Sequence, residues 1–386
     1  MIKTLSAIVL LTSSIYAQIT FDEFLNDAIK NSPYLKKNAL NITQTTLENE
    51  VLQRTKNPTL ELEYSRFEPD ANGYKIAFSQ NFKGWGVADD IKKFTSVKLQ
   101  KIEAKYNLSY AQFQQNISLL FVQYAQKQKL YTLAKEELEI ASRIYAISQK
   151  RYDVGTISQG VMFQAKVEFD IVSIELDSLY LDSQKEYFAL FEIAGYSAPI
   201  ALDYHYDFII QNNIKSLQNP SLTYLENLED EQQVFSKLQA HTIESFDIYT
   251  SFEHENKQEI VSVGVSFDLP IFNTKKQEIE VAKLERDKVR LEIQKKQKSI
   301  TLKLLELKQE RVSLYALEVK NRVALTTQEK LLQMFEKSYK IARVNLLELQ
   351  TIKNRVIQTK KTLIKLHSLL DINTINRNYL QGFYNE

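Results

Sequence analysis

Two long stretches of this chain contain neither glycine nor proline, the residues that interrupt helices most strongly. They are residues 87–154 and 271–381, and both are rich in leucine, lysine, glutamate, glutamine and alanine, which favour helix. At a rise of 1.5 Å per residue, helices over 88–153 and 275–341 would each be about 100 Å long. The sequence therefore predicts a fold built on two very long helices.

The chain also contains an internal repeat with an offset of 187 residues. Identical residues at equivalent positions are Pro33 and Pro220, Tyr152 and Tyr339, Lys166 and Lys353, and Gly195 and Gly382. We therefore expect two tandem copies of one unit, at 18–195 and 220–386, joined by a linker at 196–219.

Each copy is expected to contain a helix, a β-hairpin, a very long helix and a return helix. In the first copy these elements are a helix at 21–56, a hairpin at 59–82, a long helix at 88–153 and a return helix at 159–194. In the second copy they are a helix from 220 onward, a hairpin at 246–269, a long helix at 275–341 and a return helix at 346–381. Narrow apolar seams on otherwise polar helices indicate that each long helix and its return helix form an antiparallel coiled-coil hairpin. The predicted fold class is mainly α with a small β part.

The four expected strands alternate apolar and polar residues. In the first strand Leu60, Leu62 and Tyr64 share one face, and in the last strand Val263 and Val265 do the same. Strands of about nine to eleven residues with one apolar face match transmembrane barrel strands, but a sheet packed on helices shows the same alternation. Four strands cannot close a barrel, so a membrane interpretation requires several chains to share one. Aromatic residues near the strand ends are candidates for interfacial girdles: Tyr64, Phe67, Tyr74, Phe82, Trp85, Phe246 and Phe252.

Residues 1–17 have the pattern of a secretory signal peptide, with Lys3, an apolar run and Ala17 at the expected cleavage site. A buried N-terminal helix is the alternative. No other stretch approaches the roughly 18 to 20 apolar residues of a membrane-spanning helix. If the chain crosses a bilayer, we expect it to do so with strands.

The composition excludes several classes of function. With 49 Lys and Arg against 48 Asp and Glu, the net charge of +1 argues against nucleic acid as a partner. The absence of cysteine excludes disulfides, thiolate zinc sites, thiol catalysis and a lipidated N-terminal cysteine. No nucleophile with a base, phosphate loop or metal-ligand cluster is evident, so we predict neither an enzyme nor a cofactor.

The residues around the expected helix reversals resemble a known family. The run from Arg151 to Ser158, followed by Ala165 and Gly195, resembles the tip motif and following helix of the TolC-like outer-membrane efflux proteins. The segment 339–349 resembles the same motif in the second repeat, but Ala342 stands where the family often has glycine. The run 263–273 resembles the strand-to-helix entry of the heavy-metal efflux subgroup, whose members are often lipoproteins, whereas this chain has no cysteine.

The resemblance implies a homotrimer in the bacterial outer membrane that extends into the periplasm. Each chain would add four strands to a twelve-stranded barrel, continued by a tunnel of twelve helices. Such a channel is the exit duct of a tripartite efflux pump or type I secretion system, with a periplasmic adaptor and an inner-membrane transporter as partners. The alternative function is a periplasmic coiled-coil adaptor or scaffold without a pore. An adaptor would need a lipoyl-like or barrel domain and usually has one helical hairpin, whereas two hairpins and paired strands are expected here. The resemblance does not specify the cargo, and metal ions, drugs and secreted polypeptide are all alternatives.

The resemblance also suggests two groups of functional residues. The expected adaptor-docking tip comprises Arg151, Gly155 and Ser158 in the first repeat and Tyr339, Ala342 and Asn345 in the second. Gly155 is equally explained as an ordinary helix C-cap. The expected periplasmic gate centres on Glu348, with Arg343, Lys353 and Arg355 as cations that could pair with it across subunits. The spacing of Asn345 and Glu348 also fits a simple helix cap.

Overall fold

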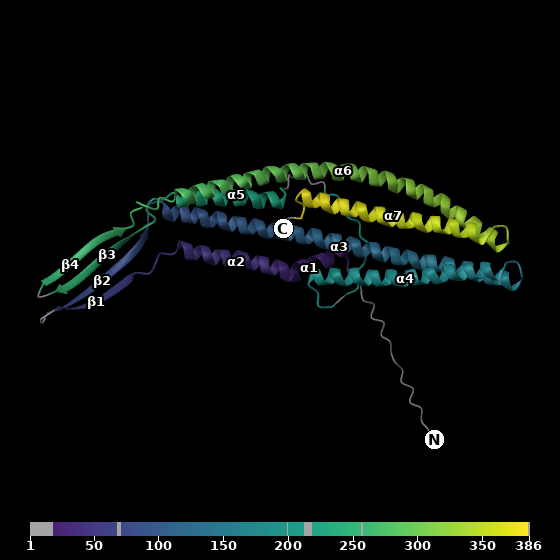
Figure 1. The fold of residues 1–386 in the computed structure, drawn as a ribbon, viewed down its shortest axis with the longest axis horizontal. Helices are drawn as coiled ribbons and strands as arrows, with labels where there is room; N and C mark the ends of the chain where they lie inside the picture. Colours follow the sequence, from purple (N-terminus) through teal and green to yellow (C-terminus); the bar gives the residue numbers. More distant parts are fainter. Residues whose placement is uncertain (1–17, 68–70, 199, 212–217, 256–257, 385–386) are drawn as a thin grey trace, which may run out of the picture. The chain divides into compact units, whose positions relative to one another are not determined.

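The computed structural model describes residues 18–67, 71–198, 200–211, 218–255 and 258–384. The predicted signal peptide at 1–17 and the turn at 68–70 lie outside this part. The elements are α1 (Phe21–Asn31), α2 (Pro33–Gln53), β1 (Thr59–Phe67), β2 (Ala71–Lys83), α3 (Val87–Asp153), α4 (Gln159–Ala194), α5 (Pro220–Gln239), β3 (Ser245–Glu255), β4 (Gln258–Phe267), α6 (Lys276–Lys340) and α7 (Leu346–Leu380) (Figure 1). The predicted fold class, mainly helical with a small four-stranded part, is confirmed.

The chain divides into two compact units, and these are not the two repeats. Unit 1 takes its residues from Met1–Pro33, Phe113–Asn212 and Glu306–Asn378, and unit 2 from Tyr34–Gln112, Asn213–Leu305 and Tyr379–Glu386. Each unit therefore combines parts of both repeats. The long helices α3 and α6, of 67 and 65 residues, contribute to both units. None of the helices in the described part of the chain is long and apolar enough to cross a membrane.

The first helix differs from its prediction. One helix was expected at 21–56, but the chain breaks at Ser32 between α1 and α2, and α2 ends at Gln53. Proline disfavours the helical conformation at the residue before it, and Ser32, which precedes Pro33, has φ −54° and ψ 118°. At the far end, Lys83 Nζ lies 2.8 Å from the carbonyl oxygens of Leu52 and Gln53 and so satisfies the last turn of α2.

The four strands form one antiparallel sheet in unit 2, in the order β1-β2-β3-β4. The register pairs Leu62 with Ile76 and Ile76 with Phe252, so these apolar residues share a face, as the alternation predicted. Leu62 is 70% exposed and Val263 is 77% exposed in the single chain. The other face is polar, with Lys75 Nζ at 3.4 Å from Glu61 and Asn81 Nδ2 donating to Asp247 at 3.1 Å.

Several of the predicted girdle aromatics lie together on the apolar face. Phe246 stacks between Phe82 and Trp85, with ring centroids 5.7 and 5.6 Å away. Tyr74 stacks on His254 at 5.1 Å. The side chain of Phe67 lies outside the described part of the chain. The girdle itself stays a prediction.

In unit 1 each long helix has its return helix alongside it (Figure 1). A ring contact of 5.5 Å joins Tyr131 of α3 to Tyr180 of α4. All four helices contribute to one apolar cluster, formed by Ile144, Ala165, Leu332, Tyr339, Leu346, Leu349, Ile352 and Val356. This cluster positions the reversals that follow α3 and α6.

Residues 200–211 of the expected linker belong to unit 1 and pack on other parts of it. The amide of Ile19 donates to the carbonyl of Ala201 at 3.0 Å, and Asn378 Nδ2 donates to the carbonyl of Ile209 at 2.9 Å. Phe21 of α1 packs on Phe208, with ring centroids 5.2 Å apart. Residues 200–211, which we call the connector, are thus bound to α1 and α7.

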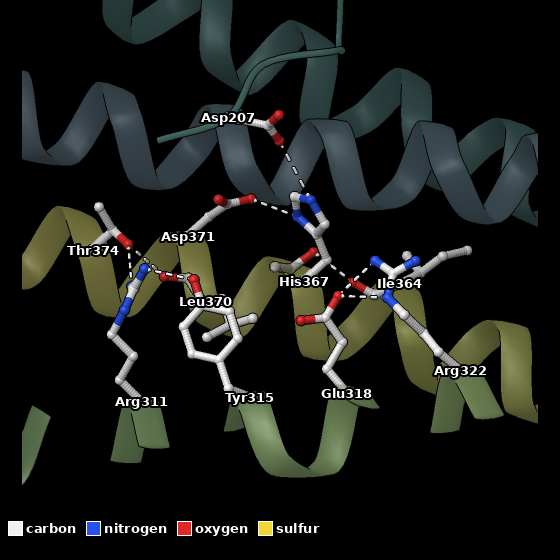
Figure 2. Close-up of polar contacts among 11 residues, drawn as sticks. Asp207, Arg311, Tyr315, Glu318, Arg322, Ile364, His367, Leu370, Asp371 and Thr374 are labelled. Carbon is white, nitrogen blue, oxygen red and sulfur yellow. Dashed lines mark hydrogen bonds and ion pairs between the residues drawn. The ribbon is translucent and has the colours of Figure 1, made fainter. Parts of the chain in front are cut away.

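A histidine of α7 faces the connector. Nδ1 of His367 lies 3.0 Å from Asp371, and its Nε2 lies 3.4 Å from Asp207 of the connector (Figure 2). The hydrogen bond to Asp371 raises the pKa of His367 above its usual value, against the opposing effects of burial and of Lys129 on α3. Protonated His367 therefore links α7 to the connector.

Candidate functional site

The first helical hairpin reverses at residues 154–158. Gly155 has φ +75°, a left-handed conformation that favours glycine. Its amide donates to the carbonyl of Tyr152 at 2.8 Å, and the amide of Thr156 donates to the carbonyl of Arg151 at 2.8 Å. These two bonds satisfy the end of α3, and the Ser158 hydroxyl accepts the amide of Val161 at the start of α4.

The second reversal repeats this geometry 187 positions later. Ala342 takes the place of Gly155 with φ +62°, and its amide donates to the carbonyl of Tyr339 at 3.2 Å. The amide of Arg343 donates to the carbonyl of Ser338 at 2.9 Å, as Thr156 does to Arg151. A methyl-bearing residue is therefore held in a conformation that costs it about 1–2 kcal/mol.

The two reversals contact each other through Arg151 and Tyr339. The Arg151 guanidinium lies over the Tyr339 ring, 4.7 Å from its centroid, and Nη1 donates to the Tyr339 carbonyl at 3.1 Å. The Tyr339 hydroxyl lies 2.7 Å from Ser148 Oγ. Tyr339 is fully buried, so it cannot touch an adaptor directly, contrary to its predicted place on the docking tip. Tyr339 instead holds the two reversals together, because its hydroxyl contacts Ser148 and its ring contacts Arg151, both on α3.

The surface of the tips is formed by Gly155, Ser158, Ala342 and Asn345, which are exposed. Two apolar residues join them: Val154 is 72% exposed and Ile341 is 59% exposed. Sequence reasoning did not select this pair, although both residues directly precede a left-handed reversal at equivalent repeat positions.

Glu348 lies in the first turn of α7 and is exposed. Its backbone amide donates to Asn345 Oδ1 at 2.9 Å, and its carboxylate accepts a hydrogen bond from the Asn345 amide at 3.4 Å. This reciprocal pair is a capping box. Arg343 and Arg355 are exposed, and no cation of the described chain lies within ion-pair distance of Glu348.

Lys353, unlike Glu348, Arg343 and Arg355, is not exposed. It is completely buried, with Nζ 2.9 Å from Glu137 of α3 and 2.6 Å from Glu168 of α4. A cation enclosed by two carboxylates of its own chain is not accessible to Glu348 of a neighbouring subunit, so its predicted place at the gate is wrong. Glu137 and Glu168, which sequence reasoning missed, are its actual partners.

Two further lysines of α7 extend this network. Lys361 Nζ lies 2.6 Å from Glu175 of α4 and 3.9 Å from Glu137. Lys360 lies 3.1 Å from Glu136 of α3 and 3.4 Å from Glu329 of α6. Burial opposes the charge of Lys360, but hydrogen bonds and charge from the two carboxylates outweigh it and raise its pKa. Ion pairs from α7 thus reach all three neighbouring helices.

The described residues contain no group of three or more histidine, aspartate or glutamate side chains that could hold a metal ion. The site thus consists of two helical reversals in contact with each other, with ion pairs from α7 to the three neighbouring helices.

Comparison with solved structures finds bacterial membrane channels. The outer membrane channel CmeC of Campylobacter jejuni superimposes with a TM-score of 0.79 at 14% identity, over 95% of this chain and 86% of that one. CusC, described for its transmembrane channel formation, gives 0.80 at 13% identity over 96% and 95% of the two chains. The outer membrane protein VceC of Vibrio cholerae gives 0.78 at 13% identity over 94% and 95%. No protein-family model and no curated protein matches the chain. The chain therefore has the fold of these outer-membrane channels, as the resemblance of its tip motifs implied.

Proposed function

We propose that this protein is the outer-membrane exit duct of a tripartite efflux pump or type I secretion system. The observation that carries the proposal is the channel fold over nearly the whole chain, combined with a four-stranded sheet that has one exposed apolar face. The protein conducts cargo passively from the periplasm-spanning pump to the exterior and is not an enzyme.

The sheet supports an oligomer in lipid. Both β1 and β4 have a strand on one side only, which leaves two open edges in the described part of the chain. Open edges are not tolerated in hydrocarbon, because unpaired backbone groups there cost several kcal/mol each. Three copies would join β4 of one chain to β1 of the next and close a barrel of twelve strands.

The helices support the same assembly. Apolar residues exposed in the single chain follow heptad spacing on α4, at Val167, Ile171, Ile174 and Leu181. A second series lies on α6, at Leu284, Leu291, Leu305, Val312 and Val319, with steps of seven residues and one step of fourteen. Exposed seams with this period are typical of helices that pack against another helix. We assign them to contacts between neighbouring chains of the trimer.

The partners follow from the duct function. A periplasmic adaptor docks at the exposed tip residues Gly155, Ser158, Ala342 and Asn345, and the adaptor connects the duct to an inner-membrane transporter. Glu348 forms the periplasmic gate together with Arg343 and Arg355. A scaffold without a pore is disfavoured, because a scaffold has no use for an amphipathic sheet.

The proposal is tested by cell fractionation, mild detergent gels and planar bilayers. We expect the protein in the outer-membrane fraction, as a heat-labile trimer that conducts ions. Val263→Arg places a charge on the apolar face at a cost of about 2–4 kcal/mol near the bilayer midplane and should abolish membrane assembly. Ser266→Arg on the polar face of the same strand is the matched control and should assemble normally. A monomeric periplasmic protein without conductance, or equal loss in both variants, would refute the duct.

A further inference from the structure

A cavity of about 500 Å³ lies within unit 2, where the ends of β2, α2 and α5 meet the starts of α3 and β3. This volume falls in the range of small-molecule sites, about 300–1,000 Å³. One wall is apolar and consists of Val87, Ile91 and Phe94 of α3 with Phe235 and Leu238 of α5. The rings of Phe94 and Phe235 pack with centroids 5.7 Å apart, so this wall is continuous.

Three cations are among the other residues that line the cavity. Arg54, Lys56 and Lys83 line it, and Glu244 is the one acidic residue among the described lining residues. Glu244 is paired with Lys275, which neutralises it. Two of the three N–H groups of Lys83 donate to the carbonyl oxygens of Leu52 and Gln53 at the end of α2. The third N–H group is available to donate to a ligand. The cavity thus presents an apolar wall and a net positive charge.

The cavity lies on the polar side of the sheet. Asn81 and Lys83, which line it, alternate along β2 with Phe82, which belongs to the apolar face. Asn81 donates a hydrogen bond to Asp247 of β3 on the polar face. Phe82 stacks on Phe246, the residue of β3 that precedes Asp247, on the apolar face. In a duct, the apolar face meets lipid and the polar face meets the conduit. Asn81 and Lys83 therefore line the cavity from the face of the sheet that would meet the conduit.

We propose that this cavity is a binding site for an amphipathic organic anion carried by the duct. The apolar body of the anion packs against the wall of α3 and α5, and its anionic group meets Lys83, Arg54 and Lys56. The inference rests on the proposed function, because cargo reaches the polar side only if the protein conducts it. It adds a class of cargo that the channel fold does not specify.

The test uses 1-anilinonaphthalene-8-sulfonate as the probe and trimeric protein in nanodiscs of zwitterionic lipid. Trp85 is the only tryptophan of the chain and lies two residues before Val87, so energy transfer from it reports probe bound nearby. Octane-1-sulfonate should displace the probe at about tenfold lower concentration than octyltrimethylammonium. Each contact between the sulfonate and a cation of the cavity should raise the binding affinity a few-fold. Empty nanodiscs supply the background.

Variants separate the cavity from general binding. Arg54→Glu combined with Lys56→Glu should weaken sulfonate binding about tenfold. Lys295→Glu combined with Lys298→Glu makes the same charge change at exposed positions of α6 and should leave binding unchanged. Ile91→Phe narrows the cavity and should also weaken binding.

Each contrary outcome is diagnostic. Equal displacement by both octyl compounds, or binding that survives both cavity variants, overturns the inference. If anionic phospholipid in the nanodisc abolishes sulfonate binding, the bilayer fills the cavity and the cargo assignment is wrong. Trimers that conduct but bind no sulfonate overturn this inference alone, whereas protein that forms neither trimers nor conductance overturns the proposed function.

Discussion

Replacing Lys353 by methionine should be among the most damaging single changes in unit 1. The side chain is fully buried between Glu137 and Glu168, with Nζ–Oε distances of 2.9 and 2.6 Å. Methionine keeps most of the volume but leaves two carboxylates without their cation. Removing one partner of a buried ion pair costs about 3–5 kcal/mol, because the remaining charge is desolvated and uncompensated.

The structure places this variant at the lower end of that range. Glu168 is 28% exposed at its side chain, so water can hydrate it, whereas Glu137 is only 7% exposed. Lys361 lies 3.9 Å from the second oxygen of Glu137 and offsets part of the lost attraction. We therefore expect Lys353→Met to lower the free energy of unfolding by about 3 kcal/mol. Adding Glu137→Gln should recover most of this loss, because it removes the charge left unpaired.

The chain supplies its own control in Lys166, which occupies the equivalent position of the first repeat. Lys166 is half exposed and pairs with Asp170 at 3.7 Å, so Lys166→Met should cost at most about 0.5 kcal/mol. Guanidinium unfolding followed by far-UV circular dichroism, at one protein concentration in detergent, measures both variants. Equal losses for the two lysines would show that burial of the Lys353 ion pairs contributes nothing, and our reasoning would be wrong.

Three further predictions concern single residues. Ala342→Gly should raise the free energy of unfolding by about 0.5–1 kcal/mol, because glycine relieves the left-handed strain. Gly155→Ala should lower the free energy of unfolding by about 1–2 kcal/mol for the same reason. Chemical denaturation that shows the opposite order would contradict this. The pKa of His367 is raised in the folded chain by Asp371, so its contribution to stability is complete below about pH 6.5 and is lost as the pH rises through the folded value. Thermal unfolding of His367→Gln should lack this decrease, and an unchanged pH profile would refute the link. Glu348→Gln keeps the capping bond, so a higher single-channel conductance with weaker block by divalent cations indicates a gate, whereas parental conductance and block indicate a cap only.

The sequence by itself determined the features that depend on local conformation. The glycine- and proline-free stretches form helices that end near Asp153 and Lys340, because the next residues must adopt left-handed or capping geometry. The alternation in the strands placed Leu62 and Val263 on the apolar face, since a strand turns each successive side chain to the opposite side. The break at Ser32 is also a local effect, because Pro33 disfavours the helical conformation at the residue before it.

Only the tertiary structure decided which equivalent residues of the two repeats become buried. Lys166 and Lys353 are the same residue at the same repeat position, yet one is solvated and the other is enclosed. The difference lies in α3 and α4, which bring Glu137 and Glu168 to Lys353 from far along the chain. Local sequence determines helix ends and strand faces, but burial depends on which distant segments pack together, and that choice is made by the whole fold.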